Sequence, residues 1–128
     1  MTLHESGQMY LETIYVLSQK HSCVRAIDVG EQLGYSKPSV SRAMSILKKE
    51  GYVTVAEDGS LSLTESGRTV AQTMFTRHTA LTKLLVGLGV SEAVASEDAC
   101  RIEHVISEES FAAVQRHLEQ YGSGADKP

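Results

Sequence analysis

The fold of this chain is decided by residues 36–63, SKPSVSRAMSILKKEGYVTVAEDGSLSL, where the spacing of apolar residues changes from helical to extended. Apolar residues recur every three or four positions as far as Leu47, which is typical of an amphipathic helix. After Gly51, residues 52–55 and 61–63 read as two strands, and the Asp-Gly pair between them is a strong signal for a tight turn. The stretch therefore predicts a helix followed directly by a two-stranded hairpin.

The helix within this stretch has a clear start. Ser36 can cap its first turn, and Pro38 falls where a missing backbone N–H costs nothing. A shorter helix is expected just before it, over residues 26–33, with Gly34 ending it. Two helices joined by a short turn and followed by a hairpin form a winged helix-turn-helix, whose second helix enters the major groove of DNA.

Four further helices are expected, one before this motif and three after it, because apolar residues keep helical spacing there. Thr64, Ser91 and Ser107 are placed to open the last three. The approximate ranges are 4–20, 64–88, 91–106 and 107–121. The fold class is therefore mostly α, with an N-terminal winged helix-turn-helix followed by a helical domain.

Composition limits the possible functions. With 128 residues and 41% apolar content, the chain can bury one core, or one small domain with an oligomerisation arm. No stretch approaches the ~20 apolar residues needed to cross a bilayer, and no signal peptide is recognisable, so we expect a cytoplasmic protein that does not bind membranes. The two cysteines, Cys23 and Cys100, lie far apart and are expected to be reduced thiols.

Charge is distributed unevenly along the chain. The net charge is −4, yet residues 20–49 hold six lysines and arginines against two acidic residues. A basic segment on an acidic body points to a polyanion partner, although an ordinary solvated surface is an alternative. We expect the partner to be double-stranded DNA.

The exposed face of the expected recognition helix combines cations with small hydroxyl groups that suit DNA phosphates. Arg42 can also form a forked contact with a guanine edge. A solvated helix of a protein–protein module is the alternative. The hairpin tip has no basic residue, so a phosphate contact there would use backbone groups or Ser60. The candidate DNA-contacting residues are Arg25, Ser36, Lys37, Pro38, Ser39, Ser41, Arg42, Lys48 and Lys49.

Three residues of the expected fifth helix are potential metal ligands. Cys100, Glu103 and His104 have spacings of three and four, which brings them to one helical face. This face lies nearly opposite the apolar stripe, so the cluster is not simply part of the core. The alternative is a solvated charged face with a stray cysteine.

Other helices carry further potential ligands. Met9 and Glu12 share one face of the first helix, and His78 stands among apolar residues of the fourth. A packing methionine, an exposed carboxylate and a hydrogen-bonded histidine at the edge of the core are the alternatives for these residues.

Several strings together resemble the diphtheria toxin repressor family of metal-dependent transcriptional regulators. The resemblance covers about residues 5–121. Its fold is the expected one, with the metal sites between the winged-helix domain and a helical dimerisation domain. The strings are Met9–Tyr15, Ser36–Ser41, Leu63–Arg68, Arg77–His78 and Cys100–His104.

The resemblance implies a set of ligands. Those matching the primary site of the iron-responsive branch are Met9, Cys100, Glu103 and His104. His78 matches a ligand of a neighbouring second site, and Glu12 matches a ligand of the manganese-responsive branch. Thr82 and Ser96 stand where the iron branch has further second-site ligands, which they do not adequately replace. A second ion would need Glu12 and His78, with Glu103 bridging.

Ligand chemistry gives an order of metals. The thiolate and thioether are soft ligands that favour iron(II), cobalt, nickel or zinc over manganese. We expect a divalent transition metal, with iron(II) favoured and manganese(II) second, and with zinc(II), cobalt(II) or nickel(II) able to substitute in vitro.

The resemblance also implies domains and a function. Residues 1–70 would form the DNA-binding domain, residues 71–121 the metal-binding and dimerisation domain, and residues 122–128 a flexible tail. The protein would be a homodimeric repressor of metal-uptake genes on a palindromic operator, without a small-molecule substrate.

Two other functions remain open. A winged-helix regulator could sense an organic ligand or oxidation through Cys100, without metal. An enzyme using Cys100 and His104 would need a third orienting group and an oxyanion element, neither of which is recognisable, so we expect no enzyme.

Overall fold

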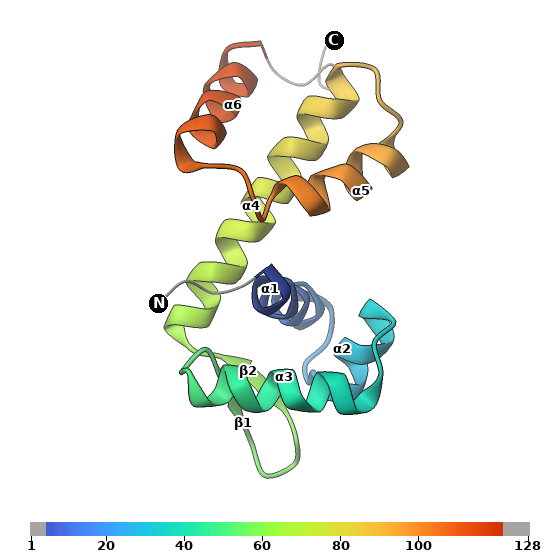
Figure 1. Ribbon diagram of the computed structural model, residues 1–128, viewed down its shortest axis with the longest axis vertical. Coiled ribbons are helices and arrows are strands. Elements are labelled where there is room, and N and C mark those ends of the chain that lie inside the picture. The colour runs from blue at the N-terminus through green and yellow to red at the C-terminus, as the bar shows by residue number, and fades with distance from the viewer. Residues whose placement is uncertain (1–4, 122–128) are drawn as a thin grey trace. The chain divides into compact units, whose positions relative to one another are not determined.

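The computed structural model describes residues 5–121 and contains six helices and one two-stranded hairpin in that range (Figure 1). The expected order of elements and the mostly α fold class are confirmed. The flexible tail expected at 122–128 lies outside the described residues. The elements are α1 (Glu5–Lys20), α2 (Ala26–Leu33), α3 (Lys37–Lys49), β1 (Val53–Val55), β2 (Leu61–Leu63), α4 (Glu65–Gly87), α5 (Glu92–Ile102) and α6 (Glu108–Tyr121).

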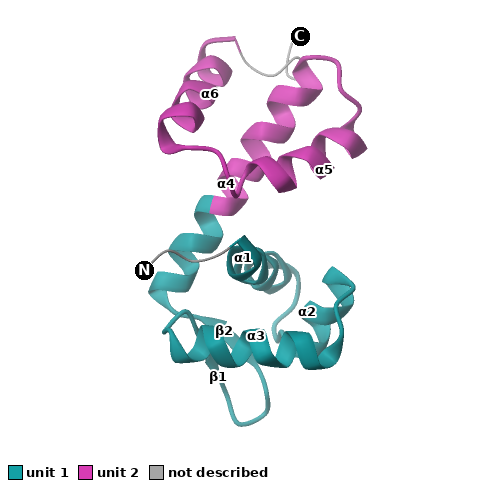
Figure 2. Ribbon diagram, viewed as in Figure 1, with its two compact units in different colours: residues 1–73 teal, residues 74–128 magenta. Residues whose placement is uncertain are grey.

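The chain divides into two compact units, residues 1–73 and residues 74–128 (Figure 2). The boundary falls within the long helix α4. Each unit has its own cluster of buried apolar side chains. Within the described residues, no helix has the length and apolar character needed to cross a membrane.

Unit 1, residues 1–73, is built on a continuous apolar core. Leu11 and Ile14 of α1, Val29 of α2 and Val40 of α3 are fully or almost fully buried, and Val53 of β1 joins them. Burial of such side chains is the main stabilising contribution, at about 1.5–3 kcal/mol each. The core fixes α3 against α1 and α2 and leaves the opposite face of α3 exposed.

The hairpin is antiparallel, with Val53 opposite Leu63 and Val55 opposite Leu61. Gly59 at its tip has a φ of 88°, which L residues with a side chain rarely adopt. The outer edge of β2 is also occupied at Leu61, because the Leu61 N–H donates to the Val24 carbonyl oxygen, with an N···O distance of 2.7 Å. The segment before α2 therefore lies alongside the hairpin.

Three of the expected helix starts are capped by side chains. Ser36 accepts a hydrogen bond from the Ser39 N–H, and Ser107 accepts one from the Ser110 N–H. Thr64 accepts from the Gly67 N–H and donates to the Gly51 carbonyl oxygen. These caps satisfy backbone N–H groups that have no partner within the helix. The capping predictions for these three helices are confirmed.

Unit 2, residues 74–128, has a smaller apolar core made by Leu81, Ala99 and Phe111. Here one sequence prediction is wrong. The fifth helix ends at Ile102 rather than near Ile106, and the next three residues form a turn. Ile106 therefore follows the turn and packs against this core instead of extending a helical stripe.

Candidate metal centre and nucleic-acid interface

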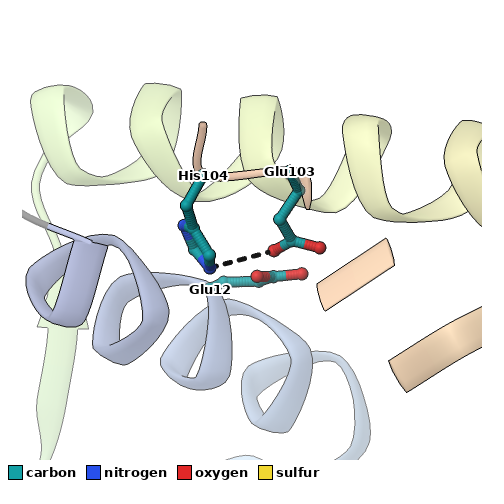
Figure 3. A group of neighbouring side chains, drawn as sticks. All are labelled: Glu12, Glu103 and His104. Carbon is teal, nitrogen blue, oxygen red and sulfur yellow. Dashed lines mark ion pairs between the residues drawn. The ribbon is translucent and has the colours of Figure 1, made fainter. Parts of the chain in front are cut away.

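The candidate metal ligands of unit 2 gather around the carboxylate of Glu103, whose side chain is 0% exposed. Its Oε1 lies 2.8 Å from Nδ1 of His78, and its Oε2 lies 3.5 Å from Nε2 of His104. Figure 3 shows the second pair as a dashed line. A buried carboxylate is costly unless charged or hydrogen-bonding groups surround it, and here two imidazoles meet it.

The burial of Glu103 corrects the expected position of this cluster. The helical pattern predicts Cys100, Glu103 and His104 on a face away from the core, yet the side chains of Glu103 and His104 are both 0% exposed. Glu103 still has helical backbone angles, and its N–H donates to the Ala99 carbonyl oxygen. The physical reason for the correction is that this face of the chain is covered, with His78 of α4 lying against the Glu103 carboxylate. Cys100 remains on α5 and is half-buried.

Arg77 holds this turn in place, a role that the sequence reasoning missed. Its Nη1 donates hydrogen bonds to the carbonyl oxygens of Glu103 and Ile106, with an N···O distance of 3.1 Å in each case. Its guanidinium also lies 5.6 Å from the centre of the Phe111 ring, which is within the range of a cation–π contact. The only sequence signal was its place next to His78 in one of the family-like strings.

His78 has partners on both ring nitrogens. Besides the Glu103 contact, its Nε2 lies 3.2 Å from the Ser96 hydroxyl oxygen. Thr82 instead donates to the backbone carbonyl oxygen of His78 over 2.7 Å, one helical turn away. Ser96 is thus a hydrogen-bond partner of the His78 ring, whereas the Thr82 hydroxyl is engaged with the backbone of α4.

The donor set of this cluster fits a divalent transition metal. Carboxylate and imidazole groups are common ligands of such ions, and a cation would offset the buried charge of Glu103. A half-buried thiol, Cys100, stands three residues earlier.

Unit 1 holds the other two candidate ligands, both on α1. Met9 and Glu12 are half-buried, and the Met9 sulfur accepts a hydrogen bond from the Tyr35 hydroxyl over 3.5 Å. Glu12, which Figure 3 labels, offers a carboxylate of the kind that binds divalent metals.

The second candidate site is the exposed face of α3. All the expected DNA-contacting residues are exposed except Ser39, which is half-buried. Ser39 is engaged at the start of the helix, because its hydroxyl oxygen accepts a hydrogen bond from Ser36. Lys37, Arg42 and Lys48 give this face a positive charge without an acidic residue on the helix itself.

The hairpin tip has a cation that sequence reasoning did not place there. Arg25 donates from Nε to the Asp58 carbonyl oxygen over 3.1 Å, and its Nη2 lies 3.8 Å from the Asp58 carboxylate. Ser60 donates to the same carboxylate from both its hydroxyl and its N–H. The Ser60 hydrogen bonds, and then Arg25, hold the pKa of Asp58 below its ordinary value.

Tyr10 shows how closely α1 and α3 interact. Burial raises the pKa of its phenol, the neighbouring Tyr35 raises it further, and the positive charge of Arg42 opposes both effects. The phenol is therefore neutral at physiological pH.

Comparisons with known proteins match both halves of the chain to one family. Residues 2–61 match the iron-dependent repressor N-terminal DNA-binding domain, and residues 64–123 match the iron-dependent repressor metal-binding and dimerisation domain. The chain belongs to the iron-dependent repressor family. The expected resemblance is thus confirmed.

Relatives in this family cover almost the whole chain. The diphtheria toxin repressor of Corynebacterium diphtheriae is 36% identical over 119 residues, which are 91% of this chain and 50% of the relative. The iron-dependent repressor IdeR of Mycobacterium bovis is also 36% identical, over 91% of this chain and 49% of the length of IdeR. This chain therefore spans about half the length of these relatives.

A solved structure of similar fold is a manganese-dependent transcriptional repressor complexed with manganese. Its sequence is 29% identical to this chain, and the TM-score is 0.82. The alignment covers 88% of this chain and 52% of the manganese-dependent repressor chain. Iron-dependent and manganese-dependent proteins are thus both similar to this chain. Members of the family are DNA-binding transcriptional regulators rather than enzymes, in agreement with the expectation that this chain is not an enzyme.

Proposed function

We propose that this protein is a metal-dependent DNA-binding transcriptional regulator, and specifically a repressor of metal-uptake genes that is active when metal is plentiful. The observation that carries the proposal is the fully buried Glu103 carboxylate between two imidazoles, in a chain that also presents a capped, basic helix. The first feature suits a cation sensor, and the second suits the major groove. Such a regulator would act in the cytoplasm.

The two functions divide along the chain. Residues 1–70 would bind DNA and residues 71–121 would bind metal and form a homodimer. The exposed apolar side chains of unit 2 support the second role, since Leu88 is 71% exposed, Val94 48% and Val105 75%. Apolar surface of this kind commonly marks a contact with another protein. A symmetric dimer would match a palindromic operator.

The proposed ligands are Met9, Glu12, His78, Cys100, Glu103 and His104. Those of unit 2 are supported by the Glu103 contacts with both histidines. Met9 and Glu12 are proposed from the family resemblance and from the types of their side chains. A second ion would need Glu12 and His78, with Glu103 bridging the two sites.

Iron(II) is the favoured metal and manganese(II) the second. A thiolate and a thioether both favour softer ions than manganese. Zinc(II), cobalt(II) and nickel(II) should replace iron in vitro, because affinity for such a site generally rises from iron(II) through cobalt(II) to nickel(II), and thiolate and imidazole ligands also suit zinc(II). The names of the relatives are consistent with either iron or manganese.

A bound ion would raise DNA affinity in two ways. Ligands from α1 and from unit 2 would share it, so the ion would restrict motion between the DNA-binding residues and the dimer. The two recognition helices would then lose less conformational entropy when they bind successive major grooves. The positive charge would also offset Glu12, Glu103 and the Cys100 thiolate, reducing repulsion of the phosphates.

The test is DNA binding by fluorescence anisotropy in anaerobic buffer, on an operator selected from a random duplex pool. Iron(II), manganese(II), zinc(II) and chelator are compared. Glu103→Ala and His104→Ala should lose metal-enhanced binding and remain dimeric by sedimentation. Unchanged metal dependence in both variants rules out the proposed centre. Operator binding that persists in chelator but is lost with peroxide would favour a sensor acting through Cys100.

A matched control is Arg42→Ala, which alters the DNA face and leaves the cluster intact. It should weaken operator binding by about 10- to 100-fold, the loss expected for one forked base contact. Its metal affinity should equal that of the wild type. A metal affinity that falls together with DNA affinity would show that the two sites are not separate.

A further inference from the structure

Tyr35 occupies the turn between α2 and α3. It follows Gly34, whose φ of 73° ends α2, and it precedes Ser36, the N-cap of α3. Its N–H donates to the Gly30 carbonyl oxygen over 3.1 Å, and a Cβ on Gly30 would lie 3.4 Å from the Tyr35 carbonyl oxygen. The main chain of Tyr35 is thus fixed by α2.

The side chain of Tyr35 reaches α1. Its ring packs edge-on against Tyr10, with ring centroids 5.9 Å apart and planes at 68°. Its hydroxyl donates to the Met9 sulfur over 3.5 Å. Tyr10 is 6% exposed and therefore holds the Tyr35 ring on a rigid surface, although Tyr35 itself is 44% exposed.

This hydrogen bond limits the freedom of the methionine. A methionine side chain has three rotatable bonds and no fixed direction for its sulfur. Its thioether is a weak acceptor, and a donor on one side leaves another lone pair for an ion. Histidines that bind metals are oriented in the same manner, by a partner on the ring nitrogen that does not face the ion.

We propose that Tyr35 is a positioning residue for Met9 and connects that ligand to the start of the recognition helix. The inference rests on the proposed function, because it takes Met9 as a metal ligand. Holding the thioether in advance reduces the rotamer freedom that is lost when an ion binds, and so raises affinity. The gain applies to ions that accept thioether sulfur, which makes Tyr35 a determinant of metal selectivity.

The same residue couples the ligand to α3. Because Tyr35 and Ser36 are consecutive, a change in the position of Met9 acts on the residue next to the N-cap. A fixed Met9 therefore favours a fixed first turn of α3, where Ser36, Lys37 and Ser39 are expected to meet DNA. This connection lies wholly within unit 1.

The test is Tyr35→Phe, which keeps the ring and its packing on Tyr10 and removes only the hydroxyl. Metal affinity is measured by competition with a chromophoric chelator, using cobalt(II) and manganese(II) alone. Cobalt affinity should fall by about three- to tenfold, somewhat less than for partners of stronger ligands. Manganese affinity should not change, since manganese gains little from sulfur. Tyr52→Phe, a hydroxyl deletion elsewhere in unit 1, should leave both affinities unchanged.

Met9→Leu supplies the second arm of the experiment. It should lower cobalt affinity and alter the visible spectrum of the cobalt-loaded protein, and adding Tyr35→Phe should then have no further effect. If Met9→Leu weakens cobalt binding but Tyr35→Phe does not, the inference fails and the proposed function stands. An equal loss of cobalt and manganese affinity in Tyr35→Phe also overturns the inference. If Met9→Leu leaves cobalt affinity unchanged, Met9 is not a ligand, and both that part of the proposed site and the inference fail.

Discussion

The two units are stabilised by different interactions. Unit 1 has a continuous core of aliphatic side chains, from Leu11 to Val53, and none of its described charged residues is fully buried. Unit 2 buries few apolar side chains and places a carboxylate beside two imidazoles. The stability of unit 1 thus rests mainly on apolar burial, whereas that of unit 2 also depends on which groups surround the Glu103 carboxylate.

The largest expected effect on this contrast comes from metal. Cobalt(II) at about 100 times its dissociation constant should stabilise the folded protein by about 2.7 kcal/mol. Hydrogen exchange should locate the gain mainly in α5 and the turn after it, with the hairpin β1–β2 changing least. Glu103→Ala should abolish the gain. If cobalt(II) still slowed hydrogen exchange equally in both units of Glu103→Ala, the two units would not differ in their dependence on Glu103.

The next effect should be confined to unit 1. A Cβ on Gly67 would overlap the carbonyl oxygen of Tyr52, so Gly67→Ala must displace backbone. The expected loss is about 1–3 kcal/mol, as for other overpacked sites. Urea unfolding measures it, with the exposed Ser66→Ala as the control. Cobalt affinity should remain at the wild-type value, and a large fall would show that the units do not respond separately.

A smaller effect concerns the start of α3. Ser36→Ala removes the cap and should cost about 1 kcal/mol, whereas Ser36→Asn keeps a capping oxygen and should restore most of it. Thermal unfolding gives the stabilities, and operator anisotropy shows whether affinity follows them. Equal stabilities of the alanine and asparagine variants would exclude a capping role.

The smallest effect is electrostatic and lies at the hairpin tip. Ser60→Ala should raise the pKa of Asp58 toward its ordinary value of 3.8, because the leading cause of its lowering is removed. In the wild type this contribution to stability is present above the unfolded-state pKa and is lost as pH falls through the lower folded value. NMR titration of the carboxyl carbon measures the shift. Ser62→Ala, on the exposed face of β2, should leave it unchanged.

Local features of the fold could be predicted from sequence, and distant contacts could not. Ser36, Thr64 and Ser107 cap helices as expected, because a cap depends on residues within one turn. The buried Glu103 instead contacts Arg77 and His78, which are 26 and 25 residues away. The helical pattern of residues 91–106 alone therefore cannot show that this face is covered.

The candidate sites divide in the same way. The sequence singled out His78, Glu103 and His104, and the structure brings these three together. It could not show that Arg25 lies at the hairpin tip, 33 residues away along the chain, because no local pattern links the two. Which residues bind metal or DNA stays a prediction.

The contacts of residues 23–25 with the hairpin have a consequence for self-association. The outer edge of β2 is met by the Val24 carbonyl oxygen, the Cys23 sulfur contacts the Ser60 hydroxyl, and Arg25 covers Asp58. An open edge strand offers unpaired N–H and C=O groups to any other strand that approaches, and so promotes aggregation. Residues 23–25 occupy this position beside β2, so at Leu61 the edge is not open to pairing with a strand of another copy.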